Sequence, residues 1–436
     1  MSEKKELSLF KQDIINCTEH IRKTKALKIS FYVNFVYVIF TILSFFLIPL
    51  VMPIENTLVA NDFRIFYQSA QTISNNPELL YSLPDYNMPF RYLPLFSLFF
   101  IPYTLIPYEI AFTIHTIILG VVQTASFYLV YIISTRFYKI KYDNKVKSDL
   151  LFICLMAPLQ VPMILIGQIS HFFILFILLV ILLMENVRVK RYNIKYEQVF
   201  IGLLLGFSIS LKPFAILLIP FLVKMVITIK NEKIKIHFNN GLKLIFGLFL
   251  SQISNFIYLI LYPNILQDFL GINTSTQLFN YPSTSITRLI SVIFDSFSIE
   301  AIVMIILIFP LYGLLYSIYL LTPNNKINYP VYFSGIILVI MIIYTDSWFL
   351  NFLIWFTVIF PGLFQFEDEI TLHSSIKIQK KLKITNFIIY KISYYGILYF
   401  TLGVVIGLTI ITTDPIMPFL LIILYIIIIW RLIRCR

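Results

Sequence analysis

The stretch that decides the fold runs from Asn56 to Pro94 and reads NTLVANDFRIFYQSAQTISNNPELLYSLPDYNMPFRYLP. It follows the first apolar run, residues 29–53, and is the longest polar interval in an otherwise hydrophobic chain. A connection of this length between membrane helices is usually either disordered or functional. Its many aromatic and leucine side chains supply apolar surface to pack, which argues against disorder. We therefore interpret it as a folded lid on the membrane surface.

One part of this stretch, NDFRIFYQSAQTI, has the pattern of a capped amphipathic helix. We expect Asn61 or Asp62 to be the N-cap, because short polar side chains accept hydrogen bonds from the first helical N–H groups. Four side chains recur at helical spacing on one face: Phe63, Phe66, Tyr67 and Ala70.

The composition excludes a soluble domain. Of the 436 residues 59% are hydrophobic and 13% charged, and the mean hydropathy is +0.85, whereas a water-facing surface needs more charge. Runs of about 20 apolar residues, enough to cross a bilayer, recur along the chain. We place the crossings at 29–53, 109–134, 149–166, 168–185, 199–211, 213–229, 244–263, 299–321, 330–346, 348–365, 386–412 and 417–430. The sequence thus predicts an all-α polytopic membrane protein with about 12 transmembrane helices and a long extracytoplasmic first loop, residues 54–92.

The segment 93–107 is apolar but short and bounded by prolines, so we expect it to be re-entrant or interfacial. The remaining chain divides simply. Residues 1–28 are predicted to be a cytoplasmic, basic, amphipathic segment that touches anionic lipid. Residues 29–436 form a single transmembrane domain, and no cleavage site follows the first apolar run, so a cleaved signal peptide is not expected.

The net charge of +12 has a topological explanation. With the N-terminus inside, all but four of the 34 basic residues fall in cytoplasmic segments, as the positive-inside rule requires. This accounts for the basic balance without nucleic acid, and membrane lipids are the expected surroundings. The four cations left outside are Arg64, Arg91, Lys212 and Arg288.

The unusual polar residues also fall on the outer side in this topology. They are Asp62, Gln168, His171, Asp346, Trp348 and Asn351, together with the four outer cations. Such residues at the ends of membrane helices are costly unless they are paired or used. A set of this kind on one face describes a site for an anionic, hydroxyl-rich ligand beside lipid.

Several segments resemble glycosyltransferase family 87, whose members are polyprenol-phosphate-mannose-dependent mannosyltransferases of the GT-C type. The resemblance begins with NDFRIFYQSA (61–70), LLYS (79–82) and FRYLPLFSLFFIPYTLIP (90–107). It continues with GQISHFFILFILLVILLME (167–185), GLLLGFSISLKPFAILLIPFLV (202–223) and DSWFLNFLIWFTVIFPGL (346–363). The motifs occur in the family's order over about residues 55–365. Two positions depart from the family pattern: Ser170 replaces asparagine and Asn351 replaces histidine.

The resemblance implies a GT-C-type bundle in the cell membrane, with its active site on the extracytoplasmic side. It implies inverting transfer of a hexose, mannose, from a polyprenyl phosphate to a hydroxyl of a lipid- or glycan-linked acceptor. Such a transfer needs a carboxylate to accept the acceptor's proton, and the family's catalytic aspartate matches Asp62. It also needs cations for the phosphate leaving group, and the candidates are Lys212 and Arg288, then Arg91 and Arg64.

The remaining candidates concern the sugar, the acceptor and a cofactor. Gln168 and His171 are candidates to position phosphate or sugar, with Asp346 and Asn351 nearby in the pattern, and Trp348 to stack on a sugar ring. No cofactor is expected with a lipid-linked donor. No metal motif is present, although a divalent cation shared by Asp62 and Asp346 remains an alternative. The three cysteines lack the spacing of a disulfide framework or a zinc site.

Structural explanations compete for each residue. Asp62 is equally suited to a helix N-cap, and Lys212 to an interfacial lysine that extends toward water. Arg288 and Arg91 can pair with Asp295 and Asp85. His171 can pack between helices and Trp348 can belong to the interfacial aromatic belt.

Two other functional classes compete with a transferase. A transporter or flippase of lipid-linked glycans is disfavoured because the chain shows no inverted repeats and its polar residues gather at one face. A structural membrane subunit has no need of four outer cations.

Overall fold

The computed structural model describes residues 3–53, 57, 59–81, 90–140, 160–230, 233–274, 283, 285–294, 296, 299–344 and 417–434. In the N-terminal half the elements are α1 (Glu3–Lys23), α2 (Lys25–Leu47), η1 (Ile48–Leu50), α3 (Asn61–Asn75), η3 (Pro77–Leu79), α4 (Pro94–Phe100), η4 (Ile101–Leu105), α5 (Tyr108–Ile132), η5 (Ile133–Phe137), α7 (Gln160–Ile166), α8 (Ser170–Val189) and α9 (Glu197–Leu211). They continue with η6 (Pro213–Leu222), α10 (Val223–Val226), β1 (Ile227–Lys230), β2 (Lys233–Ile236), α11 (Phe238–Leu261), α12 (Asn264–Thr274), α13 (Ile286–Ile293), α14 (Glu300–Leu321), η9 (Asn324–Lys326), α15 (Tyr329–Ile343) and α20 (Met417–Arg434).

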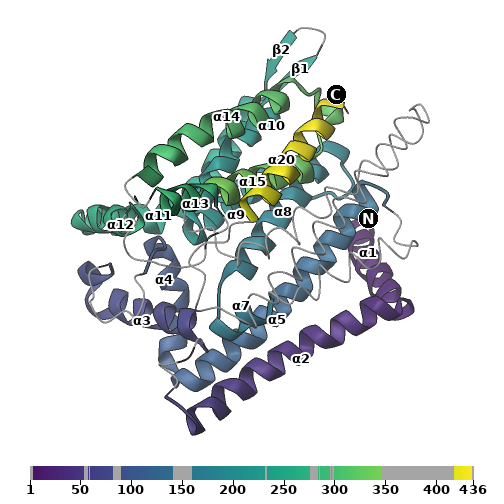
Figure 1. Cartoon of the computed structure of the whole chain (residues 1–436). Coiled ribbons are helices and arrows are strands. Elements are labelled where there is room, and N and C mark those ends of the chain that lie inside the picture. The colour runs from purple at the N-terminus through teal and green to yellow at the C-terminus, as the bar shows by residue number, and fades with distance from the viewer. Residues whose placement is uncertain are drawn as a thin grey trace.

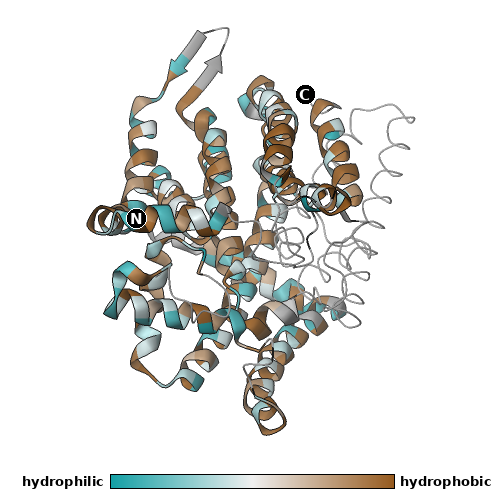
Figure 2. Ribbon diagram, turned by 60° about the vertical axis from the view of Figure 1, so that its left-hand side comes forward, coloured by the Kyte–Doolittle hydropathy of each residue, from teal (hydrophilic) through white to brown (hydrophobic). Residues whose placement is uncertain are grey.

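Five of the described helices are long and apolar enough to cross a membrane: Leu27–Leu50, Tyr108–Phe137, Ser170–Val189, Phe238–Leu261 and Ile302–Leu321. Shorter apolar helices cover Pro94–Leu105, Glu197–Leu211, Pro213–Val226, Tyr329–Ile343 and Pro418–Ile433. Figure 2 shows that hydrophobic residues dominate most of these helices. A polytopic helical membrane protein is therefore confirmed, while the expected number of about 12 crossings stays a prediction. The crossings predicted at 348–365 and 386–412 lie outside the described residues.

The strand content differs from the all-α expectation at one place. The end of the crossing predicted at 213–229 is not helical, because β1 and β2 form an antiparallel hairpin in which Ile227 pairs with Ile236 and Lys230 with Lys233. The sequence ITIK…KIKI alternates apolar and polar residues, a period of two that suits a strand. The hairpin projects beyond the helices in Figure 1.

Helices α9 and α11 pack closely because glycines remove side chains from their interface. A Cβ at Gly202 would lie 2.1 Å from the Leu244 carbonyl oxygen, and one at Gly247 would lie 2.0 Å from that of Val199. Small residues four apart allow such close approach between membrane helices. The pair is further joined by Gln252, whose amide nitrogen donates to the Gly206 carbonyl at 2.6 Å. This closely packed pair of helices supports the C-terminal end of α9, where Lys212 lies.

Helix α9 ends at Lys212 for a local reason. Pro213 lacks a backbone N–H and disfavours helical geometry at the residue before it. Lys212 accordingly has φ −145° and ψ 99°, and a 3-10 run, η6, follows. The break therefore places Lys212 between α9 and η6.

The opposite end of the bundle carries the N-terminal helix α1. The carboxylate of Asp13, 3% exposed, forms an ion pair with Arg136 at 2.8 Å and accepts from Arg191 at 2.8 Å. It also accepts from the Tyr192 hydroxyl at 2.7 Å. Arg136 ends the α5 span and Arg191 follows α8. Figure 1 shows α1 beside this end, while α3 and α4 lie at the other. The 20 residues of α8 separate the two ends by about 30 Å.

Candidate functional site

Helix α3 begins with a feature that the sequence prediction missed. Its N-cap is Ala60, in the left-handed region at φ 57° and without a side-chain cap, so the expectation of Asn61 or Asp62 as N-cap is wrong. The Ala60 N–H instead donates to the Leu165 carbonyl at 2.8 Å. This bond joins the start of α3 to the end of α7. The Asp62 carboxylate lies in the first turn of α3 and does not cap the helix.

The face of α3 predicted to pack is buried. Phe63, Phe66 and Ala70 are at most 1% exposed, and Tyr67 is half-buried. The rings of Phe63 and His115 lie 4.9 Å apart, and those of Phe66 and Tyr92 lie 5.3 Å apart at 77°. Aromatic pairs of this geometry fix the helix against its neighbours. Helix α3 is therefore held rigidly, and Asp62 with it.

A glycine turn brings the second polar group to Asp62. Gly167 has φ +74°, and a Cβ there would lie 2.7 Å from the Cβ of Phe63, so a larger residue meets both strain and a clash. The His115 imidazole Nε2 hydrogen-bonds the Gly167 carbonyl at 3.0 Å. His115 is fully buried within α5. The turn between α7 and α8 is thus fixed from two sides, and it carries Gln168.

The amide of Gln168 is oriented by its neighbours. Its Oε1 accepts from the Ile169 N–H at 2.8 Å and from the Tyr92 hydroxyl at 3.4 Å. Its Nε2 therefore faces Asp62 and donates to Oδ2 of that carboxylate. A side-chain amide that donates to a carboxylate favours its ionised form.

Lys212 completes the group from the end of α9. Its ammonium nitrogen lies 5.2 Å from the centroid of the Tyr92 ring, and its positive charge acts on Asp62. Segment 90–95 is held to α9 and α11 by two backbone N–H groups. Leu93 donates to the Ser210 carbonyl at 3.4 Å, and Leu95 donates to Asn255 Oδ1 at 2.7 Å.

The environment of Asp62 suits proton transfer near neutral pH. Burial raises the pKa of the carboxyl group to about 7, while the Lys212 charge and the Gln168 hydrogen bond lower it by less. A base whose pKa lies near the working pH combines a useful ionised fraction with a useful affinity for the proton. The pKa of Tyr92 is raised well above its usual value by burial and by the charge of Asp62, so its hydroxyl stays a donor.

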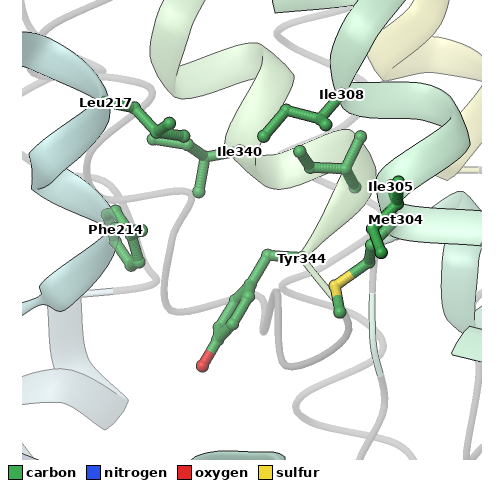
Figure 3. Close-up of a pocket in the computed structure, with 8 residues that line it drawn as sticks. Phe214, Leu217, Met304, Ile305, Ile308, Ile340 and Tyr344 are labelled. Atoms are coloured by element: carbon green, nitrogen blue, oxygen red, sulfur yellow. The ribbon is translucent and has the colours of Figure 1, made fainter. Parts of the chain in front are cut away.

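An apolar cavity of about 250 Å³ lies beside this group, between η6, α14 and α15. Its walls include Phe214, Leu217, Met304, Ile305, Ile308, Ile340, Ile343 and Tyr344. Figure 3 shows the Tyr344 hydroxyl directed away from the aliphatic side chains. Tyr344 also acts electrostatically on Tyr92, and its ring lies 5.9 Å from that of Phe214. Tyr344 thus lines the cavity and lies within electrostatic range of Tyr92.

A second apolar cavity, of about 290 Å³, reaches Ser210 and Leu211 beside Lys212 from the side of α4, α5 and α8. Apolar space thus adjoins the end of α9 on two sides.

The other predicted cations are less closely associated with Asp62. Arg288 is 3% exposed, and its Nε donates to Glu300 Oε1 at 2.6 Å. Its neighbour in α13, Thr287, donates to the Ile343 carbonyl at 2.7 Å. This bond joins α13 to the end of α15, next to Tyr344 in the chain. Arg64 interacts with the Tyr108 hydroxyl, and the charge of Arg91 acts on Tyr92.

His171 is fully buried in the first turn of α8, near the backbone of Gln168. Asp346, Trp348 and Asn351 lie outside the described residues, as do Asp85 and Asp295. Metal ligation can be assessed for the described residues alone. Among them, no three His, Cys, Asp or Glu side chains gather closely enough to hold an ion.

Tyr92, Tyr344 and His115 are the site residues that the sequence prediction missed. A histidine inside an apolar span is itself a signal, because ionisable residues in membranes are rare unless they are used. Nothing comparable distinguishes Tyr92 among the 28 tyrosines.

A comparison with known proteins covers part of the segment that carries these residues. The family model described as glycosyltransferase family 87 matches residues 90–225. The matched segment contains Tyr92, Gln168 and Lys212, and Asp62 precedes it. No curated protein matches the chain. Residues 90–225 are thus similar to glycosyltransferase family 87, and the apolar helices of the described residues fit a membrane protein.

Proposed function

We propose that the protein transfers a hexose, mannose, from a polyprenyl phosphate to a hydroxyl of a lipid- or glycan-linked acceptor, with inversion, on the extracytoplasmic side of the cell membrane. The observation that carries the proposal is the Asp62 carboxylate held by Gln168 next to the charge of Lys212. A base and a cation in one partly buried place are what displacement of a phosphate by a hydroxyl requires.

In the proposed step the acceptor oxygen attacks the anomeric carbon as its proton passes to Asp62. The bond between that carbon and the donor's phosphate oxygen breaks, and its electron pair leaves with the polyprenyl phosphate. A single displacement of this kind inverts the anomeric configuration. Gln168 keeps the carboxylate in position while it gains the proton, because its amide is fixed by Tyr92 and Ile169.

Lys212 is proposed to bind the phosphate. Its ammonium group stabilises the negative charge that grows on the leaving group, and partial burial strengthens that interaction. The apolar cavity beside Tyr344 gives the first isoprenyl units a place outside water. A donor with a charged head and a greasy tail fits a cation that lies beside such a cavity.

The experiment that tests the proposal uses the purified full-length protein in lipid with labelled polyprenyl-phosphate mannose and a mixture of lipid-linked acceptors. Wild type is expected to transfer label, and Asp62→Asn to lower kcat by about 10²–10⁴-fold, the usual contribution of a general base. Glu78→Gln is the matched control, since it removes an exposed carboxylate from the same segment. Its activity is expected to equal that of wild type.

The comparison of donors separates the parts of the proposal. Transfer from polyprenyl-phosphate glucose in place of mannose corrects the sugar, and transfer from a nucleotide sugar removes the lipid donor. Movement of labelled lipid across the bilayer without any new glycosidic bond supports the flippase and overturns the transferase.

A further inference from the structure

Tyr92 touches both halves of the candidate site, which makes it different from the other aromatic residues there. Its ring lies beneath the Lys212 ammonium at 5.2 Å from the centroid, a distance at which a cation is attracted by the negative face of an aromatic ring. Its hydroxyl donates to Gln168 Oε1 at 3.4 Å. The same side chain thus contacts the group expected to hold phosphate and the group that holds the base.

The Tyr92 ring is itself held firmly. Phe66 meets it edge-on at 5.3 Å, Phe90 lies at 5.6 Å and Phe96 at 5.1 Å. Its backbone carbonyl accepts the hydroxyl of Tyr81 at 2.7 Å. A ring fixed by three aromatic neighbours provides a defined surface for a lysine whose flexible stem otherwise permits many rotamers.

The hydroxyl of Tyr92 decides which way the Gln168 amide points. An amide oxygen accepts and an amide nitrogen donates, so two donors at Oε1, from Tyr92 and Ile169, leave Nε2 for Asp62. Removing one of the two donors weakens this preference. The Asp62 carboxylate then loses part of the hydrogen bond that favours its ionised form.

The charged surroundings of Asp62 on the described elements are few. The charge of Lys212 acts on Asp62, and the charge of Asp62 acts on Tyr92. Arg64 and Tyr67 share its helix. Among the elements packed against α3, α4 and α7 carry no titratable side chain, η3 carries Glu78 and η4 carries Tyr103, while α5 brings His115 and Tyr108 against rings of α3. Arg91 and Tyr344 act on Tyr92. A change at Tyr92 therefore reaches Asp62 mainly through Gln168.

We infer that Tyr92 is a positioning residue, whose ring sets the place of the Lys212 ammonium and whose hydroxyl sets the orientation of the Gln168 amide. The inference rests on the proposed function, because it assigns Tyr92 to the donor and to the base of that reaction. It predicts that the two roles separate when the ring and the hydroxyl are removed one at a time.

The first variant, Tyr92→Phe, keeps the ring and removes the hydroxyl. Binding of polyprenyl phosphate without sugar, measured by calorimetry in lipid nanodiscs, is expected to stay within about twofold of wild type. The acid limb of the kcat/KM profile is expected to move about half a unit to higher pH, because the ionised carboxylate loses support. The shift moves upward because a weaker hydrogen bond to the charged form raises the pKa of an acid.

The second variant, Tyr92→Leu, removes the ring as well. Affinity for polyprenyl phosphate is expected to fall about five- to tenfold, the value of a partly buried cation–π contact. The control is Phe127→Leu, which removes a buried ring of α5 whose ring contact is with Tyr128, away from Tyr92, Lys212 and Gln168. It is expected to lower Tm about as much as Tyr92→Leu does, with no change in affinity or in the pH profile.

The outcomes distinguish the inference from the function on which it rests. The inference is overturned if Tyr92→Leu binds polyprenyl phosphate as wild type does, or if Phe127→Leu weakens binding equally. It is also overturned if Tyr92→Phe leaves the acid limb in place. Failure of wild type to transfer sugar from any polyprenyl-phosphate donor instead removes the proposed function, whatever the Tyr92 variants bind.

Discussion

The two ends of the bundle each hold a buried or partly buried aspartate, and they treat it differently. Asp13 forms ion pairs with two arginines and accepts the hydroxyl of a tyrosine, all within 2.8 Å. Asp62 receives the amide of Gln168 and the influence of one lysine, and burial raises its pKa to about 7. A carboxylate that is paired with two cations and a hydroxyl is held in its ionised state. A carboxylate with less compensation keeps the affinity for a proton that a base needs.

The lysines at the two ends of one segment show the same contrast. Lys212 precedes η6 and Lys224 follows it, and each ammonium lies 5.2 Å from the centre of a tyrosine ring, Tyr92 or Tyr319. Lys224 donates to the Thr322 carbonyl, so its contacts belong to the fold. The Lys212 charge acts on Asp62. Similar pairs thus serve structure at one end and, as we propose, substrate at the other.

The largest expected effect separates the two aspartates. Asp62→Asn is expected to lower kcat by about 10²–10⁴-fold without lowering Tm. Asp13→Asn is expected to cost about 3 kcal/mol of stability, because it leaves two arginines without their carboxylate, and to keep kcat in the protein that remains folded. Thermal unfolding and transfer rates on both variants check this, and a loss of kcat in Asp13→Asn with unchanged Tm contradicts it.

The next effect separates the two lysines. Lys212→Met keeps the apolar stem and removes the charge, and KM for the donor is expected to rise about 10- to 100-fold, as for a lost charged contact to phosphate. Lys224→Met makes the same change at the other end and is expected to lower Tm while KM for the donor stays constant. Equal rises of KM in both variants would remove the distinction between the ends.

A smaller effect concerns the glycine turn that carries Gln168. Gly167→Ala is expected to cost about 1–3 kcal/mol of stability and to lower activity, because the residue has φ +74° and its Cβ meets Phe63. Gly313→Ala in α14 meets no atom within 4 Å and is expected to be neutral or to add up to about 1 kcal/mol. Unfolding in a denaturant series compares the two, and equal stabilities speak against a strained turn.

The smallest effect is the dependence of stability on pH. Because the pKa of Asp62 is raised to about 7 in the folded state, the folded protein holds a proton that the unfolded chain releases above about pH 4. The contribution of Asp62 to stability therefore falls as pH rises from about 4 to about 7. Asp62→Asn removes this fall, so its Tm is expected to exceed that of wild type at pH 8 and not at pH 5. The reverse order contradicts a raised pKa.

The sequence predicted what local chemistry determines. The spans at 108–137 and 170–189 follow from hydropathy, and Asp62 and Lys212 were singled out because charge is rare beside apolar runs. The N-cap was predicted wrongly because the bond that places Ala60 comes from Leu165, about a hundred residues away along the chain. The role of Tyr92 depends on packing among three segments, which no local pattern encodes. The hairpin at 227–236 was missed although its apolar and polar residues alternate. Its first strand was assigned to the end of the preceding apolar run, which was predicted as a membrane crossing at 213–229.

The attachment of α1 has a consequence for the order in which the protein is made. Arg191 lies 178 residues after Asp13, and ribosomes add about 5–20 residues per second. The earliest segment to emerge therefore waits roughly ten to forty seconds for its partner. In the topology that the sequence predicts, its basic, amphipathic surface would face the cytosolic leaflet during that interval, where anionic lipid can bind it until the later helices arrive.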